Sequence, residues 1–208
     1  MTVTSPLVFI ITSLILIITP GQDMILVMSR SISQGWKAGV ATASGVSVGL
    51  LGHTVLATLG LGALLSASEI LFMIIKLIGA AYLLYLGIAL LRNNHAGLDI
   101  SSLPTASLRK LFFQGVISNL SNPKIAIFYF AYLPQFIPAG AENPTFLILM
   151  LGASFAMLTF LVKGPIGYGA GILSSWLRTR PAMLGWINRL SGVVLITLGL
   201  RLAFERRN

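Results

Sequence analysis

Long runs of apolar residues, separated by short polar segments, occupy most of this chain. Six of the runs are long enough to cross a bilayer, for which roughly 20 apolar residues suffice. They are Leu7–Met28, Ala38–Leu65, Ile70–Leu91, Leu111–Phe136, Phe146–Ser174 and Leu184–Phe204. Apolar runs of this length are predicted to be helices, because a helix satisfies its own backbone hydrogen bonds in lipid. The pattern predicts an all-α membrane protein with six transmembrane helices.

Two of the six runs are interrupted by a proline among polar residues. The first contains Thr19-Pro20-Gly21-Gln22-Asp23, and the fourth contains Asn119-Leu120-Ser121-Asn122-Pro123-Lys124. A proline removes a backbone donor and clashes with the preceding turn, and broken backbone in a membrane needs protein or a wet cavity around it. We therefore predict broken first and fourth helices. For the first run, the alternative is a structural proline kink with Asp23 reaching toward the surface.

The two breaks also indicate an internal repeat. Aligning Pro20 with Pro123 aligns Phe9 with Phe112 and places the first run on the fourth. Three spans reverse the direction of the chain, so the two halves run in opposite senses. This is the plan of two inverted three-helix repeats, in which paired broken helices meet near the bilayer centre. We expect one transmembrane domain over residues 1–208, with repeat one at about 1–92, a connector at 93–110 and repeat two at about 111–208. Pro20 and Pro123 are expected to lie close together.

Composition supports an integral membrane protein. Apolar residues make up 56% of the chain and charged residues 9%, against about 45–50% and about 25% in soluble domains. A net charge of +9 would suggest nucleic acid in a soluble protein, but here the basic residues lie in loops, so we expect no nucleic-acid partner. The first, third and fifth loops carry them: Arg30, Lys37, Arg92, Arg109, Lys110, Arg178 and Arg180. The positive-inside rule then places both termini outside, although Arg206 and Arg207 argue against this orientation.

Few ionisable groups are expected at membrane depth, and each is a candidate functional group. Asp23 follows the first break, Lys124 lies in the second, and Lys163 lies in the fifth run. One acid and two bases give a centre suited to a carboxylate ligand. His53 is either a packing residue or a proton carrier, and Lys76 either extends to the outer surface or lies within the bundle.

Broken helices offer binding groups of both signs. A half-helix N-terminus attracts an anion through its free N–H groups, and a C-terminus offers carbonyls to a cation. An aspartate and a lysine beside both kinds of end fit a zwitterionic amino acid. Asp23 and His53 are the candidates for proton coupling, and Lys163 is the expected charge partner of Asp23. The predicted substrate-binding residues are Pro20, Gly21, Gln22, Asp23, Asn119, Asn122, Pro123 and Lys124.

Four motifs in this order resemble the LysE/RhtB amino-acid exporters. They are Thr19-Pro20-Gly21-Gln22-Asp23, the glycine-rich second run ending near His53, the segment from Lys76 to Gly87, and Asn119 to Lys124 followed by Leu133-Pro134-Gln135-Phe136. The resemblance implies a multi-pass protein of the bacterial inner membrane that exports amino acids or relatives such as homoserine, driven by the proton gradient. The family motif at the first break is Pro-Gly-Pro, whereas Gln22 stands here in place of the second proline. A single acid in the core favours neutral or homoserine- and threonine-like substrates, with an exporter of basic amino acids as the alternative.

Other functional classes fit the sequence less well. Aspartyl proteolysis in a membrane needs a second aspartate, and neither Gly-x-Ser-x-Gly nor His-Glu-x-x-His occurs. With two histidines and no cysteine, we expect no metal site and no cofactor. The chain has no phosphate-binding loop, so uphill transport would draw on an ion gradient, and we expect antiport with protons. A membrane scaffold without transport activity is the remaining alternative.

The second run carries the small-residue stripe Gly45-Val46-Ser47-Val48-Gly49. Such stripes let two helices approach closely. The stripe serves either packing inside the bundle or a homodimer, and we favour packing inside the bundle.

Overall fold

The computed structural model describes residues 5–19, 21–67, 69–92, 105–138, 140–178 and 181–204, and all regular structure in these residues is helical. Pro20 and most of the connector, residues 93–104, lie outside the described residues. The elements in chain order are α1 (Pro6–Ile18), α2 (Gln22–Gln34), α3 (Trp36–Ala67), α4 (Glu69–Arg92), α5 (Leu108–Leu120), α6 (Pro123–Ile127), the π turn η1 (Phe128–Tyr132), the 3-10 turn η2 (Leu133–Phe136), α7 (Pro144–Arg178) and α8 (Pro181–Phe204).

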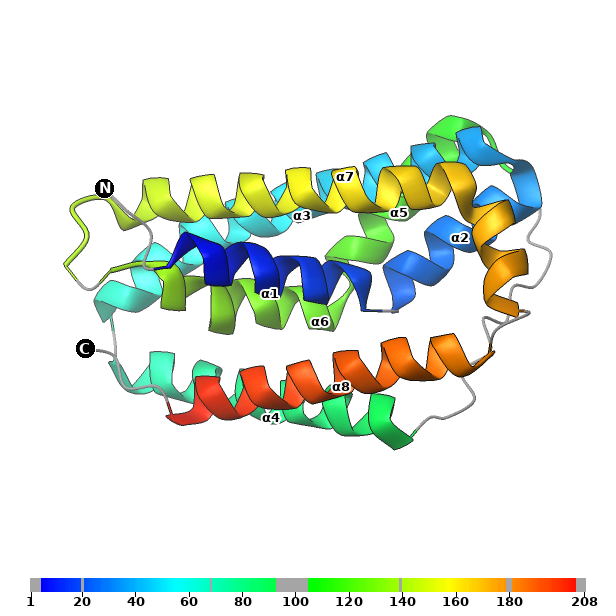
Figure 1. The fold of residues 1–208 in the computed structure, drawn as a ribbon. Helices are drawn as coiled ribbons and strands as arrows, with labels where there is room; N and C mark the ends of the chain where they lie inside the picture. Colours follow the sequence, from blue (N-terminus) through cyan, green and yellow to red (C-terminus); the bar gives the residue numbers. More distant parts are fainter. Residues whose placement is uncertain are drawn as a thin grey trace.

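The helices are arranged in three levels, with both breaks in the middle one (Figure 1). The long helices α3 and α7 pack along each other on one side, and α4 and α8 form a pair on the other side. Helices α1 and α6 lie between them, whereas α2 and α5 extend from the breaks toward the level of α3 and α7. The beginning of α1, the α3–α4 connection, the beginning of α7 and the end of α8 are at one end of the bundle. These are the segments that the loop charges predicted to share one side of the membrane.

Length and apolar character identify membrane-spanning candidates among the described helices. Trp36–Gly60 of α3 and Pro144–Ala170 of α7 are each long and apolar enough to cross a membrane. The pair α1–α2, bent by 53°, adds a third span if it is taken as one. Two further stretches, Leu77–Ala89 in α4 and Gly192–Phe204 in α8, are apolar but shorter. Every predicted apolar run coincides with a helix or a broken helix pair, as expected of a helical membrane protein.

Small residues set the closest helix contacts. Gly45, Gly49 and Gly52 all face α5, where a Cβ added to Gly49 would lie 2.8 Å from the Cβ of Asn119. The stripe of the second run is therefore used for packing inside the chain. A Cβ on Gly87 would lie 2.7 Å from the carbonyl oxygen of Gly192, so α4 and α8 also pack backbone against backbone.

Two details of the sequence interpretation are corrected by the structure. The first span was expected to end at Met28 with Arg30 in a loop, but α2 continues to Gln34 and Arg30 is only 7% exposed. The polar end of α2 stays helical because it packs against α3 and α7, and the Ser31 hydroxyl donates to the carbonyl of Gly167. The connection to α3 is Gly35 alone, at φ +86°. The fourth span, expected as helix to Phe136, changes to a π turn and a 3-10 turn after Ile127.

Candidate functional site

The first break leaves carbonyl groups that a lysine from the other half of the chain occupies. In a continuous helix the carbonyl of Leu16 would accept from the backbone nitrogen of residue 20, but residue 20 is a proline and has no N–H. The Lys124 Nζ donates instead to the carbonyl of Leu16 at 3.1 Å and to that of Thr19 at 3.3 Å. A cation is well placed at this C-terminus, where the helix dipole is negative.

The second break repeats this arrangement with a histidine. Pro123 cannot donate to the carbonyl of Asn119, and the His53 Nε2 lies 3.1 Å from that oxygen. Because a carbonyl only accepts, the imidazole carries its proton on Nε2. The Asn122 side chain caps α6 by accepting from the Lys124 backbone N–H at 3.1 Å, and Pro123 occupies the first helical position, where its missing donor costs nothing.

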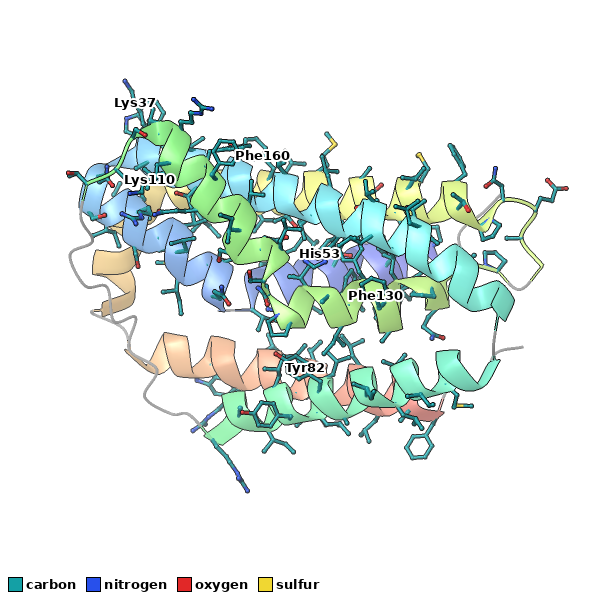
Figure 2. The ribbon with its side chains drawn as sticks, turned by 180° about the vertical axis from the view of Figure 1, so that it is seen from behind. Lys37, His53, Tyr82, Lys110, Phe130 and Phe160 are labelled. Carbon is teal, nitrogen blue, oxygen red and sulfur yellow. The ribbon has the colours of Figure 1, made fainter. Side chains whose placement is uncertain are left out.

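The two breaks are thus linked reciprocally. The repeat alignment that pairs Pro20 with Pro123 also pairs Leu16 with Asn119, the residues whose carbonyls lose their α-helical donor at the prolines. The Asn119 carbonyl also accepts from the backbone N–H of Asn122 at 2.9 Å. Lys124, in the second half, donates to the first-half carbonyl, and His53, in the first half, donates to the second-half carbonyl. His53 is 3% exposed and its ring stacks on that of Tyr129, with 5.5 Å between centroids. Figure 2 shows His53 beside the α5–α6 break.

Asp23 lies in a buried cluster of donors at the start of α2. Its carboxylate accepts from the Asn119 Nδ2 at 2.8 Å, the Asn122 Nδ2 at 3.2 Å and the Ser118 hydroxyl at 3.2 Å. The Lys163 ammonium of α7 lies 3.5 Å from the same carboxylate. Asp23 is 2% exposed and Lys163 5% exposed. A charge buried in this way is stable only with such partners, and the structure supplies them from α5, the α5–α6 break and α7.

A cavity of about 200 Å³ lies between the breaks and the α4–α8 pair. One wall consists of the breaks themselves, and the other contains Tyr82 and Leu86 of α4 and Leu195 of α8. A single water needs only about 10–15 Å³ by this measure, so the cavity has room for a small organic molecule. The described residues that line it are Thr19, Gly21, Gln22, Tyr82, Leu86, Asn122, Pro123, Lys124 and Leu195.

Asp23 does not line this cavity but lies behind it. It borders a second, much smaller space of about 10 Å³, with Asn119, Thr159 and Lys163 among its other lining residues. Lys124 borders both spaces. Its ammonium has two carbonyl partners and no acid within 4.0 Å among the described residues. The cavity therefore contains one basic group and, within the described lining, no acidic group.

The structure brings together most of the predicted site residues and adds a wall that the sequence did not indicate. Gly21, Gln22, Asn122, Pro123 and Lys124 line the larger cavity. Asp23 and Asn119 lie in the cluster behind it, Lys163 pairs with Asp23, and Pro20 is outside the described residues. Lys76 lies in α4, and its side chain is also outside the description.

The wall residues of α4 and α8 were missed because an apolar run does not distinguish a cavity-facing position from a lipid-facing one. The spacing of Tyr82 and Leu86, one helical turn apart, is the signal that could have identified them. No group of three His, Cys, Asp or Glu residues that could hold a metal occurs in the described part of the chain.

Comparison with known proteins identifies the family of the chain. A family model described as LysE type translocator matches residues 14–206. The homoserine/homoserine lactone efflux protein of Salmonella typhimurium is 34% identical over 200 residues, covering 95% of each chain. A leucine efflux protein from an Enterobacter species is 27% identical over 94% of this chain and 93% of its own. An uncharacterized membrane protein of Bacillus subtilis is 31% identical over 95% of this chain and 97% of its own.

No solved structure matches the chain. The family model nonetheless covers both breaks, the cavity wall and every described residue of the charged cluster. The chain belongs to the LysE family of translocators.

Proposed function

We propose that this protein exports amino acids or close derivatives across the bacterial inner membrane by antiport with protons. The observation that carries the proposal is the cavity of about 200 Å³ lined by both helix breaks, with the Lys124 ammonium at its edge. Binding sites of secondary transporters are formed by discontinuous helices of two inverted repeats. We extend that plan to six spans in two repeats of this chain, with the site at their interface.

Lys124 is proposed to bind the substrate carboxylate. Its ammonium already lies against the free carbonyls of α1, beside the first turn of α6. A carboxylate entering the cavity would meet this cation together with the amide groups of Gln22 and Asn122. Ammonium–carboxylate hydrogen bonds are roughly twice as strong as neutral ones, so this contact would orient the substrate.

Asp23 is proposed to bind either the substrate ammonium or a proton. Three hydrogen-bond donors and the Lys163 ammonium, 3.5 Å away, surround its carboxylate. A substrate ammonium would therefore replace Lys163 at Asp23 after the cluster opens toward the cavity. If Asp23 holds a proton or an ammonium and never both, inward proton movement is coupled to outward substrate movement.

The relatives support amino-acid substrates with neutral side chains. Two of them are named for homoserine or homoserine lactone efflux and one for leucine efflux. The described lining of the cavity has no acid to pair with a second ammonium, so basic amino acids are the less favoured substrates. A homodimer would pair through a face other than the Gly45–Gly49 stripe, because α5 covers that stripe.

The test is transport of L-homoserine and L-leucine by proteoliposomes containing Lys124→Met. We expect transport to fall by about 10-fold or more, because truncating one partner of a buried charged hydrogen bond costs about 2–5 kcal/mol. Lys124→Gln keeps a donor for the carbonyls of Leu16 and Thr19 but removes the charge, and it is expected to lose transport as well. Lys110→Met, on an exposed residue of α5, is the matched control.

Thermal unfolding in detergent would establish that each variant is folded. Unaltered transport by a folded Lys124→Met protein would contradict the proposed clamp. Full transport by Lys124→Gln alone would show that Lys124 serves only to cap α1.

A further inference from the structure

The α4–α8 wall of the cavity carries a polar group that has no hydrogen-bond partner among the described residues. The Tyr82 phenol lines the cavity and makes no hydrogen bond to any described residue. Its ring contacts that of Tyr85, with 6.2 Å between centroids. The other wall residues, Leu86 and Leu195, are apolar, so the phenol is the one polar group on this side of the described lining.

The two helices that form this wall, α4 and α8, pack closely against each other. Gly87 and Gly192 let the backbones of α4 and α8 come into contact. A Cβ added to Gly199 would lie 3.0 Å from the carbonyl oxygen of Ala80. Leu195 is fully buried. A phenol on such closely packed helices is a preorganised hydrogen-bonding group, able both to donate and to accept.

The charges determine how a substrate would lie in this cavity. Lys124 is the single charged group of the described lining, and it is on the wall formed by the breaks. An amino acid held there by its carboxylate would extend its side chain across the cavity, toward α4 and α8. In Figure 2, Tyr82 lies on α4 at the side that faces α6 and the break. A short side chain ending in a hydroxyl or a carbonyl would meet the phenol, and an aliphatic side chain would meet Leu86 and Leu195.

We propose that Tyr82 is the specificity-determining residue of this transporter, and that it hydrogen-bonds the polar side-chain group of a short neutral amino acid whose carboxylate lies at Lys124. The inference rests on the proposed function, because it assumes that the substrate occupies this cavity. It adds the substrate class: neutral amino acids with a hydroxylated side chain are preferred to aliphatic ones of similar size. A phenol can both donate to and accept from a side-chain hydroxyl.

The test compares L-homoserine with L-leucine as competing probes in proteoliposome counterflow. Tyr82→Phe removes only the hydroxyl and should lower homoserine transport by about 2- to 10-fold, as expected for one neutral hydrogen bond, mainly through a higher KM. Leucine transport should change by less than about 2-fold, since an aliphatic side chain has no partner to lose. Tyr85→Phe is the matched control, because Tyr85 lies on the same helix, is 66% exposed and does not line the cavity.

A second variant tests the α4–α8 wall by reducing the volume of the cavity. Leu86→Phe should reduce leucine transport more than homoserine transport, because the added ring occupies the space that the larger aliphatic side chain needs. Ile88→Phe is its control, on a residue that is 43% exposed and outside the lining.

The outcomes separate this inference from the proposed function. An unchanged homoserine-to-leucine ratio in Tyr82→Phe, together with loss of both activities in Lys124→Met, would overturn the role of Tyr82 and leave the exporter in place. An equal change of the ratio in Tyr82→Phe and Tyr85→Phe would also overturn it. Failure of the wild-type protein to transport either probe would overturn the proposed function and this inference with it.

Discussion

At the scale of single residues, the prolines matter through the carbonyl groups whose α-helical donor they remove. Leu16 and Asn119 each lie four positions before a proline, and each carbonyl is approached by a basic side chain from the other half of the chain. An unpaired backbone carbonyl inside a membrane costs several kcal/mol. The caps supplied by Lys124 and His53 therefore stabilise the breaks and at the same time join the two halves.

Asp23 is the residue on which the coupling mechanism depends. Asp23→Asn keeps the size of the side chain and an oxygen acceptor, but it removes the negative charge beside Lys163 and the ability to carry a proton. We expect the variant to lose uphill transport driven by an imposed pH gradient in proteoliposomes, whether or not downhill exchange persists. The measurement is accumulation of labelled L-homoserine with and without the gradient.

Asp23→Asn needs its own control, because it leaves Lys163 without a carboxylate. Combining it with Lys163→Met removes both charges and tests whether an unpaired lysine, rather than the missing carboxylate, causes the defect. Full gradient-driven accumulation by a folded Asp23→Asn protein would exclude Asp23 from coupling. His53 would then be the next candidate, since its Nδ1 is buried without a partner in the described structure.

At the scale of the elements, the sequence predicted the breaks well and the cavity wall poorly. Proline followed or preceded by polar residues is a local signal, so the ends of α1 and α5 could be located from Pro20 and Pro123. The burial of Arg30 could not be predicted locally, because it depends on α3 and α7, which pack against α2. The π turn at Phe128–Tyr132 likewise depends on the packing of η1 against α4.

Helix packing predicts that substitution by alanine changes the free energy of unfolding in opposite directions at two glycines. Gly45→Ala places a methyl group against the backbone of Phe112, whose carbonyl carbon would lie 2.8 Å away, and backbone cannot move aside as a flexible side chain can. We expect it to lower the free energy of unfolding by about 1–3 kcal/mol. Gly169→Ala meets nothing within 4 Å and should raise it by about 0.5–1 kcal/mol, since alanine is the better helix former.

These two variants are compared by thermal or denaturant unfolding in the same detergent. Equal effects of both substitutions would show that α3 and α5 are not in the close contact that the structure has. If Gly45→Ala alters chemical cross-linking between copies of the chain but leaves the free energy of unfolding unchanged, the stripe pairs two copies of the chain.

At the scale of the whole molecule, the two halves are similar in order but not in packing. The broken pair α1–α2 is followed by α3 and α4 as α5–α6 is followed by α7 and α8. Yet α2 packs against α3 and α7, whereas η1, which follows α6, packs mainly against α4. On the proposed plan of two inverted repeats, alternating access rocks one repeat against the other around a fixed site. Unequal packing of the two halves is what that proposal expects of a single state.

The orientation of this bundle in the membrane yields the last prediction. Lys37 and Lys110 lie together at one end (Figure 2), and the described loop containing Ala141 and Glu142 is at the other end, beside the start of α7. The removal of Arg30 from the loop charges weakens the positive-inside argument, but Lys37, Arg109 and Lys110 remain exposed at one end and no basic residue lies in residues 137–143. We therefore expect Lys37 and Lys110 in the cytoplasm.

Because the chain has no cysteine, single variants Ala141→Cys and Lys110→Cys can be labelled without background. A membrane-impermeant maleimide applied to intact spheroplasts should label Ala141→Cys, and it should label Lys110→Cys only after the membrane is opened. The reverse pattern would invert the protein in the membrane and place the end of α2 outside.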